Sequence, residues 1–265
     1  MELEIDVIDA FTDSVFKGNP AAVIITDNWL SENMMQSIAS ENNLSETAFL
    51  VKYDNHSYDI RWFSPMTEIA FCGHATLASA FVLFGKMPEA RVIEFSAKAV
   101  GKLSVVKTKY GHIQMDFPNT KPGKVESIPD ALKLGLSVNP IEVYRNDQAY
   151  FVVYPTESNV LEVIRDNEIL KQLAPYDVVV TSESSSENYD FSSRYFWPAN
   201  GGDEDPVTGS IHTGLAPLWS DRLNKKEMVA YQASERGGVL NCTVKGDRVL
   251  ISGTAVQYLK GSIRV

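Results

Sequence analysis

The alternation of apolar and polar residues predicts a protein built mainly from β-strands. Apolar and β-branched runs, several with a period of two residues, are typical of strands that bury one face. They occur at residues 21–26, 47–53, 58–63, 101–108, 112–117, 148–154, 177–181, 238–244 and 248–253. Glycine separates neighbouring runs within residues 109–112 and 245–248, as tight hairpins require. We therefore expect much of the strand pairing to be antiparallel.

Fewer segments carry the pattern of a helix. Residues 75–84 are apolar on nearly every face and precede Gly85, which predicts a buried central helix. Residues 206–220 are the corresponding segment of the second half, although Pro217 should end or kink that helix early. Ser31, a residue typical of N-caps, predicts a further helix directly after it.

Two stretches of the chain resemble each other. Residues 61–65 read Arg-Trp-Phe-Ser-Pro and lead to Gly73, and residues 194–198 read Arg-Tyr-Phe-Trp-Pro and lead to Gly209. Each glycine opens a run of small residues that suits a helix. The pattern predicts duplicated halves with a ligand cleft between them, because pockets form preferentially at domain junctions. The alternative is a chance match with no binding site.

The division of the chain follows from a segment rich in turn formers at residues 117–124. We expect an N-terminal lobe at residues 1–117 and a C-terminal lobe at 118–265, whose terminal strand can cross back to the first lobe. The predicted fold class is α+β. It consists of two similar lobes related by pseudo-twofold symmetry, each a mixed, mostly antiparallel sheet around a central helix.

Composition and charge exclude several classes of protein. The 265 residues are 44% hydrophobic and 22% charged, as in ordinary globular proteins. A formal net charge of −10 with scattered basic residues argues against nucleic acid as a partner. The first residues are acidic where a signal peptide is basic, and no apolar run is long enough to span a membrane. We expect a cytoplasmic protein with no membrane partner.

The usual cofactor and metal motifs are absent. The chain contains no Gly-x-Gly-x-x-Gly turn, no phosphate loop and no His-Glu-x-x-His. We expect no cofactor and no metal, with a pair formed by His74 and His212 as the alternative, since they occupy nearby places in the two repeats. Cys72 and Cys242 are too few for a disulfide framework, so both thiols should be reduced.

Acid–base groups remain as candidates for chemistry. Glu46 stands where a loop enters an apolar strand, and its alternative role is that of a solvated surface carboxylate. Asp205 precedes Pro206, which also fits an N-cap followed by proline in the first helical position. Cys72 precedes Gly73 and is a candidate thiolate with a pKa lowered by the helix N-terminus. No thiol stands at the equivalent place in the second repeat, so a symmetric two-cysteine racemase is not encoded.

Taken together, these motifs resemble the PhzF, or phenazine biosynthesis-like, family. The matching segments follow one another in the family's order over essentially the whole chain: residues 43–49, 61–65 with Glu68 and 71–76, 203–210, 236–238 and 253–256. The resemblance implies a fold like that of diaminopimelate epimerase, with the site between two lobes. It also implies a homodimer.

The resemblance implies a function as well. In the family's characterised isomerase a glutamate moves a proton along a cyclic dihydro-hydroxyanthranilate without a cofactor, and Glu46 matches that glutamate. By analogy, Glu46 takes a proton from the carbon next to the substrate carboxylate and returns one at a vinylogous position. The expected partner is a small carboxylated metabolite. The other matching positions are His74 and Asp205, which relay or orient protons, and Gly73, Gly209 and Ser210, which bind the carboxylate and the developing charge.

Two other functions stay open at this point. One is an epimerase or racemase that uses Cys72 on one side of its substrate and Asp205 or Glu46 on the other. The second is a family member that binds a metabolite or a protein without turnover. The substrate itself cannot be read from the sequence. Expected side walls of the pocket are Phe16, Asn19, Trp62 and Trp197.

Overall fold

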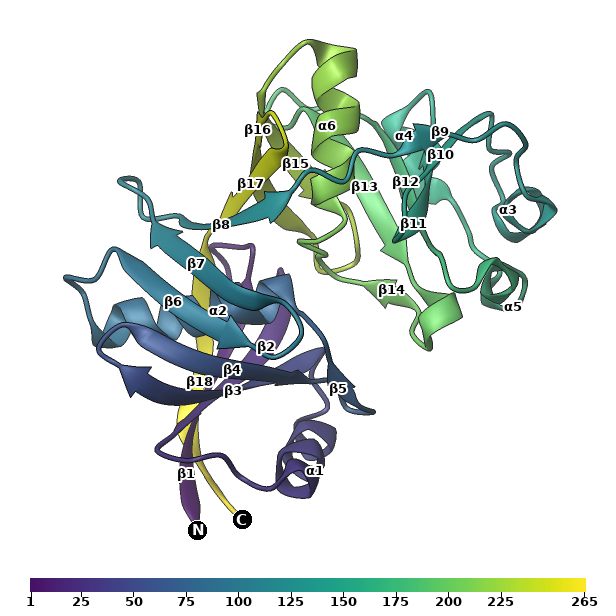
Figure 1. Ribbon diagram of the computed structural model, residues 1–265. Coiled ribbons are helices and arrows are strands. Elements are labelled where there is room, and N and C mark those ends of the chain that lie inside the picture. Colours follow the sequence, from purple (N-terminus) through teal and green to yellow (C-terminus); the bar gives the residue numbers. More distant parts are fainter. The chain divides into compact units, whose positions relative to one another are not determined.

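The computed structural model describes residues 1–265, which divide into two compact units (Figure 1). Unit 1 comprises Met1–Asp116 and Ser252–Val265, and unit 2 comprises Phe117–Ile251. Each unit contains a mixed β-sheet with few helices. The predicted α+β class with two similar lobes is thereby confirmed. No helix of the chain combines the length and apolar character needed to cross a membrane.

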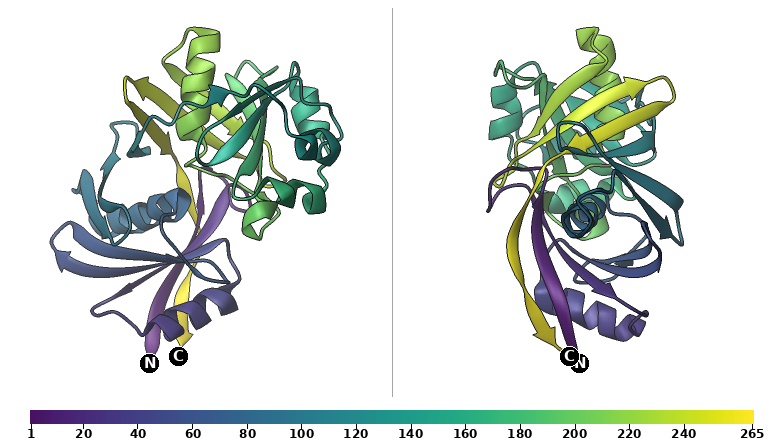
Figure 2. Two further views of the ribbon diagram at one scale, coloured as in Figure 1. Left: turned by 45° about the vertical axis from the view of Figure 1, so that its right-hand side comes forward. Right: turned by 90° about the vertical axis from the view of Figure 1, so that its left-hand side faces the viewer.

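The sheet of unit 1 is mostly antiparallel. Parallel pairing occurs only between β2 and β3 and between β4 and β6, and the two-residue strand β5 (Glu68–Ile69) adds to the end of β4. In spatial order the strands are β18 (Ala255–Arg264), β1 (Glu2–Ala10), β2 (Asn19–Thr26), β3 (Glu46–Asp54), β4 (Ser57–Phe63), β6 (Val92–Ala97), β7 (Gly101–Lys107) and β8 (Ile113–Pro118). The strands β1 and β18 run side by side in both views of Figure 2.

The central helix of unit 1 is α2 (Gly73–Lys86). Its residues are buried almost throughout, and it contacts β1, β2, β3, β7 and β18. This agrees with the apolar pattern predicted for residues 75–84. A second helix, α1 (Glu32–Asn42), contacts β3 and β4, and its N-cap is Ser31 as expected, since the Ser31 side chain accepts a hydrogen bond from the Met34 N–H.

Unit 2 repeats the plan of unit 1. Parallel pairing again occurs at two places, between β11 and β12 and between β13 and β15, and the two-residue strand β14 (Glu204–Asp205) adds to the end of β13. The strands are β9 (Gly123–Lys124), β10 (Glu142–Arg145), β11 (Ala149–Val153), β12 (Asp177–Glu183), β13 (Phe191–Phe196), β15 (Glu227–Gln232), β16 (Gly238–Lys245) and β17 (Arg248–Gly253). The same order and sense of pairing support the predicted duplication.

The helices of unit 2 are short except for α6 (His212–Leu223), which packs on β15 and β16. One apolar cluster, including Leu132, Val152 and Phe196, forms the core beside the short helices. The remaining helical segments are α3 (Asp130–Gly135), α4 (Glu157–Glu162), α5 (Asn167–Leu170), η1 (Lys171–Leu173) and η2 (Pro198–Asn200).

The predicted bounds of the second central helix were wrong. Helix α6 begins at His212, and Asp205 lies in β14, so Asp205 is not its N-cap. Pro217 lies inside the helix and does not end it. A proline removes one helical donor and leaves the carbonyl four residues earlier without its partner. Here that carbonyl, on Thr213, accepts a hydrogen bond of 3.2 Å from the Thr120 N–H.

Candidate active site

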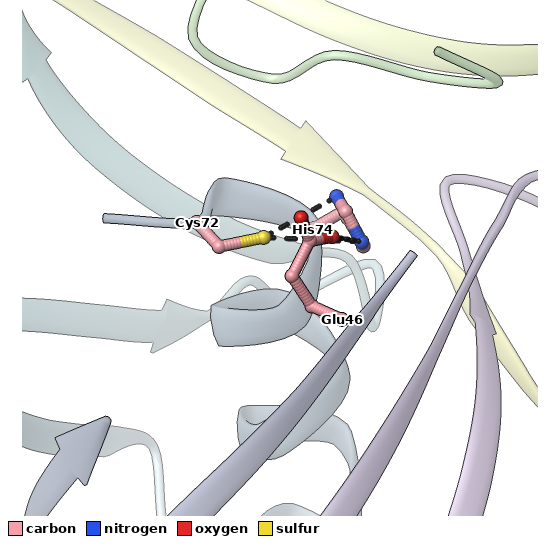
Figure 3. Close-up of side chains that lie close together, drawn as sticks. All are labelled: Glu46, Cys72 and His74. Carbon is pink, nitrogen blue, oxygen red and sulfur yellow. Dashed lines mark hydrogen bonds and ion pairs between the residues drawn. The ribbon is translucent and has the colours of Figure 1, made fainter. Parts of the chain in front are cut away.

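Three chemically different side chains meet in unit 1 (Figure 3). Glu46 is the first residue of β3, Cys72 directly precedes α2, and His74 lies in the first turn of that helix. Oε2 of Glu46 lies 2.8 Å from Nε2 of His74, an ion-pair distance. Sγ of Cys72 lies 3.4 Å from Nδ1 and 3.8 Å from Nε2 of the same imidazole. The exposed fractions of the His74 and Glu46 side chains are 6% and 14%.

The local structure explains why these groups converge. Strand β3 starts at Glu46, opposite Ala21 on β2, and both strands contact α2. Asn19 at the start of β2 is fully buried, and its Nδ2 lies 3.1 Å from Nδ1 of His74. No side chain caps the start of α2, where the helix dipole favours negative charge.

Burial and charge set the protonation of this cluster. Burial, with a further contribution from the charge of Glu46, raises the pKa of the Cys72 thiol to about 11. The hypothesis of a pKa lowered by the helix N-terminus was therefore wrong. Burial acts to lower the pKa of His74, but the combined effects of Cys72 and Glu46 raise it well above its usual value. Of these two neighbours, Cys72 contributes more than Glu46 to the raised pKa of His74.

The predicted residues of unit 2 lie around a tight turn. The Asp205 carboxylate accepts a hydrogen bond from the Thr208 hydroxyl, and the Asp205 carbonyl accepts one of 2.8 Å from Nε2 of Gln232. Oε1 of Gln232 accepts from the Thr208 N–H at 2.9 Å. After this turn come Gly209, whose carbonyl accepts from the His212 N–H, and Ser210. Gln232 thus fixes the segment that carries Asp205.

Ser210 is the end of a partly buried polar network that the sequence did not predict. Nε2 of Gln148 donates to Oγ of Ser210 at 3.0 Å and to the hydroxyl of Tyr195 at 3.1 Å. Tyr195 donates to Oδ2 of Asp177 at 2.5 Å, and Nδ2 of Asn200 donates to Oδ1 at 2.8 Å. Burial raises the pKa of Asp177, although both hydrogen bonds act to lower it.

The register of the two sheets shows which residues are equivalent. Glu46 starts β3 opposite Ala21 of its parallel neighbour, and Asp177 starts β12 opposite Ala149 of its own. Glu46 in unit 1 therefore corresponds to Asp177 in unit 2.

The short strands align the remaining positions. Glu68 pairs with Phe63, and Glu204 pairs with Phe196. Gly73 follows Glu68 by the same number of residues as Gly209 follows Glu204. His74 consequently corresponds to Ser210, and by the same strand register Trp62 corresponds to Tyr195.

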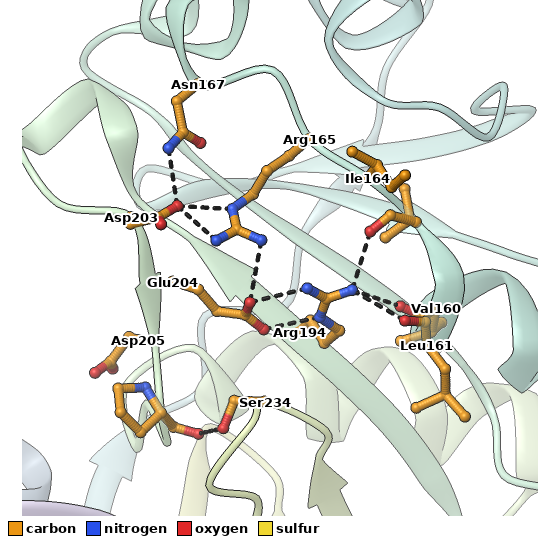
Figure 4. Close-up of polar contacts among 12 residues, drawn as sticks. Val160, Leu161, Ile164, Arg165, Asn167, Arg194, Asp203, Glu204, Asp205 and Ser234 are labelled. Carbon is orange, nitrogen blue, oxygen red and sulfur yellow. Dashed lines mark hydrogen bonds and ion pairs between the residues drawn. The ribbon is translucent and has the colours of Figure 1, made fainter.

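The arginines of the repeated motif are structural. Nε and Nη2 of Arg61 each donate to the Glu68 carboxylate at 2.6 Å, which clamps β5 to β4. Arg194 binds Glu204 in the same bidentate way at 2.8 and 2.9 Å (Figure 4). Arg165 contacts Glu204 as well, at 3.2 Å. The repeated motif of residues 61–65 and 194–198 therefore reflects a structural element that the two units share.

Comparison with known proteins identifies the family. The sequence profile of phenazine biosynthesis-like proteins (PhzC-PhzF) matches residues 8–261. The chain belongs to this family. It is 45% identical over 265 residues to an uncharacterized isomerase of Pseudomonas aeruginosa, with 100% of each chain covered. The crystal structure of a PhzF family protein from Enterococcus faecalis matches it with a TM-score of 0.94 and 43% identity, covering 100% of each chain.

These comparisons confirm the resemblance read from the motifs. Several full-length relatives are named isomerases, and this PhzF family member is an isomerase too. A more distant likeness shows the fold alone. A hydroxyproline epimerase from Agrobacterium vitis matches with a TM-score of 0.62 at 10% identity, over 99% of this chain and 92% of that one.

Proposed function

We propose that this PhzF family protein moves a proton on a small carboxylated substrate without a cofactor, and that Glu46 carries the proton. The contact of 2.8 Å between Oε2 of Glu46 and Nε2 of His74 supports this proposal most directly. Oε2 is shielded from solvent, so it is a poorly hydrated base next to a group that holds a proton. A carboxylate in such surroundings suits general acid–base catalysis.

The proposed reaction redistributes one proton and one electron pair. In trans-2,3-dihydro-3-hydroxyanthranilate the carbon that bears the carboxylate carries no hydrogen, so Glu46 removes a proton from a saturated ring carbon conjugated with it, and the C–H electron pair enters the conjugated system. Glu46 then returns a proton to the carbon that bears the carboxylate, so the substrate is neither oxidised nor reduced. His74 stays protonated beside Glu46, where it orients the carboxylate and offsets its charge. The uncapped start of α2 at Gly73 offers N–H groups to the negative charge that develops.

Ser210 is proposed to bind the substrate carboxylate. Tyr195 uses its single hydroxyl hydrogen for Asp177, and Gln148 donates to both Tyr195 and Ser210. The oxygen of Ser210 thus accepts a hydrogen bond, which leaves its own hydrogen to be donated to an anionic substrate. Asp205 is proposed to orient protons from the turn that Gln232 fixes. Gly209, which has no side chain, is proposed to let the substrate come close to the backbone.

The thiol-based alternative finds less support. Cys72 is buried and keeps its proton at neutral pH, so it is a weak general base. A binding protein without turnover is the other alternative, and it has no need of a shielded carboxylate beside a protonated histidine. We also propose a homodimer, as the family resemblance implied, which light scattering on the purified protein will test.

The deciding experiment is solvent-deuterium incorporation followed by NMR. Wild type, Glu46→Gln and Cys72→Ala are incubated in heavy water with trans-2,3-dihydro-3-hydroxyanthranilate and with a panel of amino acids. Glu41→Gln is the matched control, because Glu41 is exposed on α1. We expect exchange by wild type, Glu41→Gln and Cys72→Ala, and none by Glu46→Gln.

Other outcomes point elsewhere. A fully active Glu46→Gln variant would refute the assignment of the base. Exchange at an amino-acid α-carbon that is lost in Cys72→Ala would establish the epimerase. Binding of these compounds without any exchange would favour the non-catalytic alternative.

A further inference from the structure

The cluster in unit 1 combines three different metal-binding atom types. The thiol of Cys72, the imidazole of His74 and the carboxylate of Glu46 each offer one ligand atom, and these atoms all lie within 4.8 Å of one another. Proton transfer by Glu46 gives no role to the sulfur, although Sγ faces both nitrogens of His74. A thiol, an imidazole and a carboxylate at one point are the ligand set that zinc takes in proteins.

The distances approach those around a tetrahedral ion, and the His74 ring must turn for one ion to reach both nitrogen and sulfur, because Sγ lies nearer to Nδ1 (3.4 Å) than to Nε2 (3.8 Å). With a Zn–S bond of about 2.3 Å and a Zn–N bond of about 2.0 Å, sulfur and nitrogen ligands stand about 3.6 Å apart. Sγ of Cys72 is 3.8 Å from Nε2 of His74. Nitrogen and oxygen ligands of such an ion stand about 3.3 Å apart. Oε2 of Glu46 is 2.8 Å from Nε2, so a small rotation of the carboxylate brings it into place.

The backbone holds these ligands before any ion arrives. Cys72 and His74 stand at the start of α2, a helix buried almost throughout. The hydroxyl of Thr76 donates to the Cys72 carbonyl at 2.6 Å, which ties the first turn to the residue that carries the thiol. Nδ1 of His74 lies 3.1 Å from Nδ2 of Asn19, and a flip of the Asn19 amide would present its oxygen to the N–H of a metal-bound histidine, the usual second-shell arrangement.

We propose that Glu46, Cys72 and His74 form a binding site for a soft or borderline divalent cation, with Zn²⁺ as the best match. The ion takes three ligands from the protein and keeps a fourth position for water. Binding breaks the S–H bond of Cys72, and the proton leaves to solvent. A thiolate and an imidazole select such ions over Mg²⁺, which prefers oxygen ligands in an octahedral arrangement.

The site has a consequence for catalysis. An ion bound to Glu46 and His74 occupies the groups assigned to proton transfer, so the cation is an inhibitor. This consequence rests on the proposed function, whereas binding of the ion does not. Zinc at concentrations that saturate the site should therefore stop deuterium exchange, and a chelator should restore it.

Metal binding is tested on the untagged protein by titration with ZnCl₂ in a calorimeter and with CoCl₂ in a spectrophotometer. We expect one Zn²⁺ per chain, and a thiolate-to-cobalt charge-transfer band in the near ultraviolet. Cys72→Ser should lose the band and bind Zn²⁺ at least about 100-fold more weakly, beyond the loss typical of second-shell changes. The matched control is Cys242→Ser, since Cys242 is the other buried cysteine and lies in unit 2. It should retain both signals.

The result can overturn the proposal without any knowledge of the substrate. Absence of the charge-transfer band in the folded wild type would contradict the site, as would equal Zn²⁺ affinity of wild type and Cys72→Ser. Circular dichroism of each variant confirms that it is folded. A wild type that binds Zn²⁺ through Cys72 but shows no exchange with any substrate keeps the metal site, and then the proposed isomerase reaction alone fails.

Discussion

The two units use one backbone plan for two different kinds of polar site. At the corresponding places, unit 1 has Glu46 beside His74, whereas unit 2 has Asp177 linked through Tyr195 and Gln148 to Ser210. Glu46 has a single close polar partner, while the carboxylate of Asp177 accepts two hydrogen bonds and is held in one orientation. The first arrangement leaves an acid ready to exchange a proton, and the second fixes an acid as the anchor of a network.

This difference depends on a few side chains. Where unit 2 has Tyr195, whose hydroxyl restrains the acid, unit 1 has Trp62, which offers no hydroxyl. Where unit 1 has His74, unit 2 has Ser210, whose oxygen accepts a hydrogen bond from Gln148. Duplication thus kept the scaffold, including both arginine–glutamate clamps, and changed the chemistry at the start of one strand and one helical segment.

The two acids give the largest expected contrast. Glu46→Gln should lower the exchange rate by about 10²–10⁴-fold, the usual contribution of a general base. Asp177→Asn should leave most of kcat and act mainly on KM, because Asp177 only supports Ser210. Steady-state kinetics and circular dichroism of both variants test this contrast. Equal losses of kcat would show that both acids transfer protons.

Two buried histidines should respond to pH with opposite sign. Burial lowers the pKa of His212 to about 4. Between pH 4 and about pH 6.5 the unfolded chain therefore binds more protons at this histidine than the folded chain does. The stability that neutral His212 contributes is present above pH 6.5 and is lost as pH falls toward 4, by about 3 kcal/mol in full.

His74 should behave in the reverse way. Its pKa in the folded protein is raised, so its contribution is complete below about pH 6.5 and is lost as pH rises through the folded pKa. Ring-proton NMR across pH 4–9 will show both titrations. Titration of either His212 or His74 near pH 6.5 would contradict the prediction.

The hydroxyl of Tyr195 should matter more for stability than for the reaction. Tyr195→Phe removes one of the two hydrogen bonds to the buried Asp177, which should cost about 1–3 kcal/mol of unfolding free energy. Urea denaturation measures this cost. Tyr53→Phe is the control, because Tyr53 is 55% exposed and its change should stay within about 0.5 kcal/mol. Equal effects of the two substitutions would show that the hydrogen bond from Tyr195 to Asp177 adds nothing to the free energy of unfolding.

The smallest effects concern the orientation of Ser210. Ser210→Ala should raise KM about 10-fold through loss of a hydrogen bond to a charged substrate, with a smaller change in kcat. Gln148→Leu should raise KM less, since the serine stays but its hydrogen is no longer directed by the amide. A KM for Gln148→Leu equal to that of wild type would show that substrate binding by Ser210 does not depend on its hydrogen bond with Gln148.

Much of the fold was predictable because apolar and polar residues alternate along a strand that buries one face. Each of the nine predicted runs lies within or overlaps a strand of the structure. Strands such as β6 and β15 were missed although their buried residues also alternate. The late start of α6 was not predictable from Asp205 and Pro206, because Asp205 lies in β14, where it pairs with Tyr195 of β13.

The site was predictable only in part. The family resemblance supplied Glu46, His74 and Ser210, and the short contact of Glu46 with His74 agrees with a shared role. Their contact depends on β3 and α2 packing together, which no local pattern encodes. Gln148 and Asp177 were missed since their relation to the first unit appears only when strand registers are compared. The raised pKa of Cys72 follows from burial, which a helix start alone does not reveal.

The pairing of β1 with β18 also sets the order in which the protein can fold during synthesis. Unit 2 is one continuous stretch, so all of it is translated before β18. Until then β1 lacks its pairing with β18 along its whole length, and α2 lacks its contacts with β18. Domains usually fold in the order of translation. Here the unit that is translated first is completed last, so a nascent chain carries Glu46 and His74 in an unfinished unit until β18 has been made.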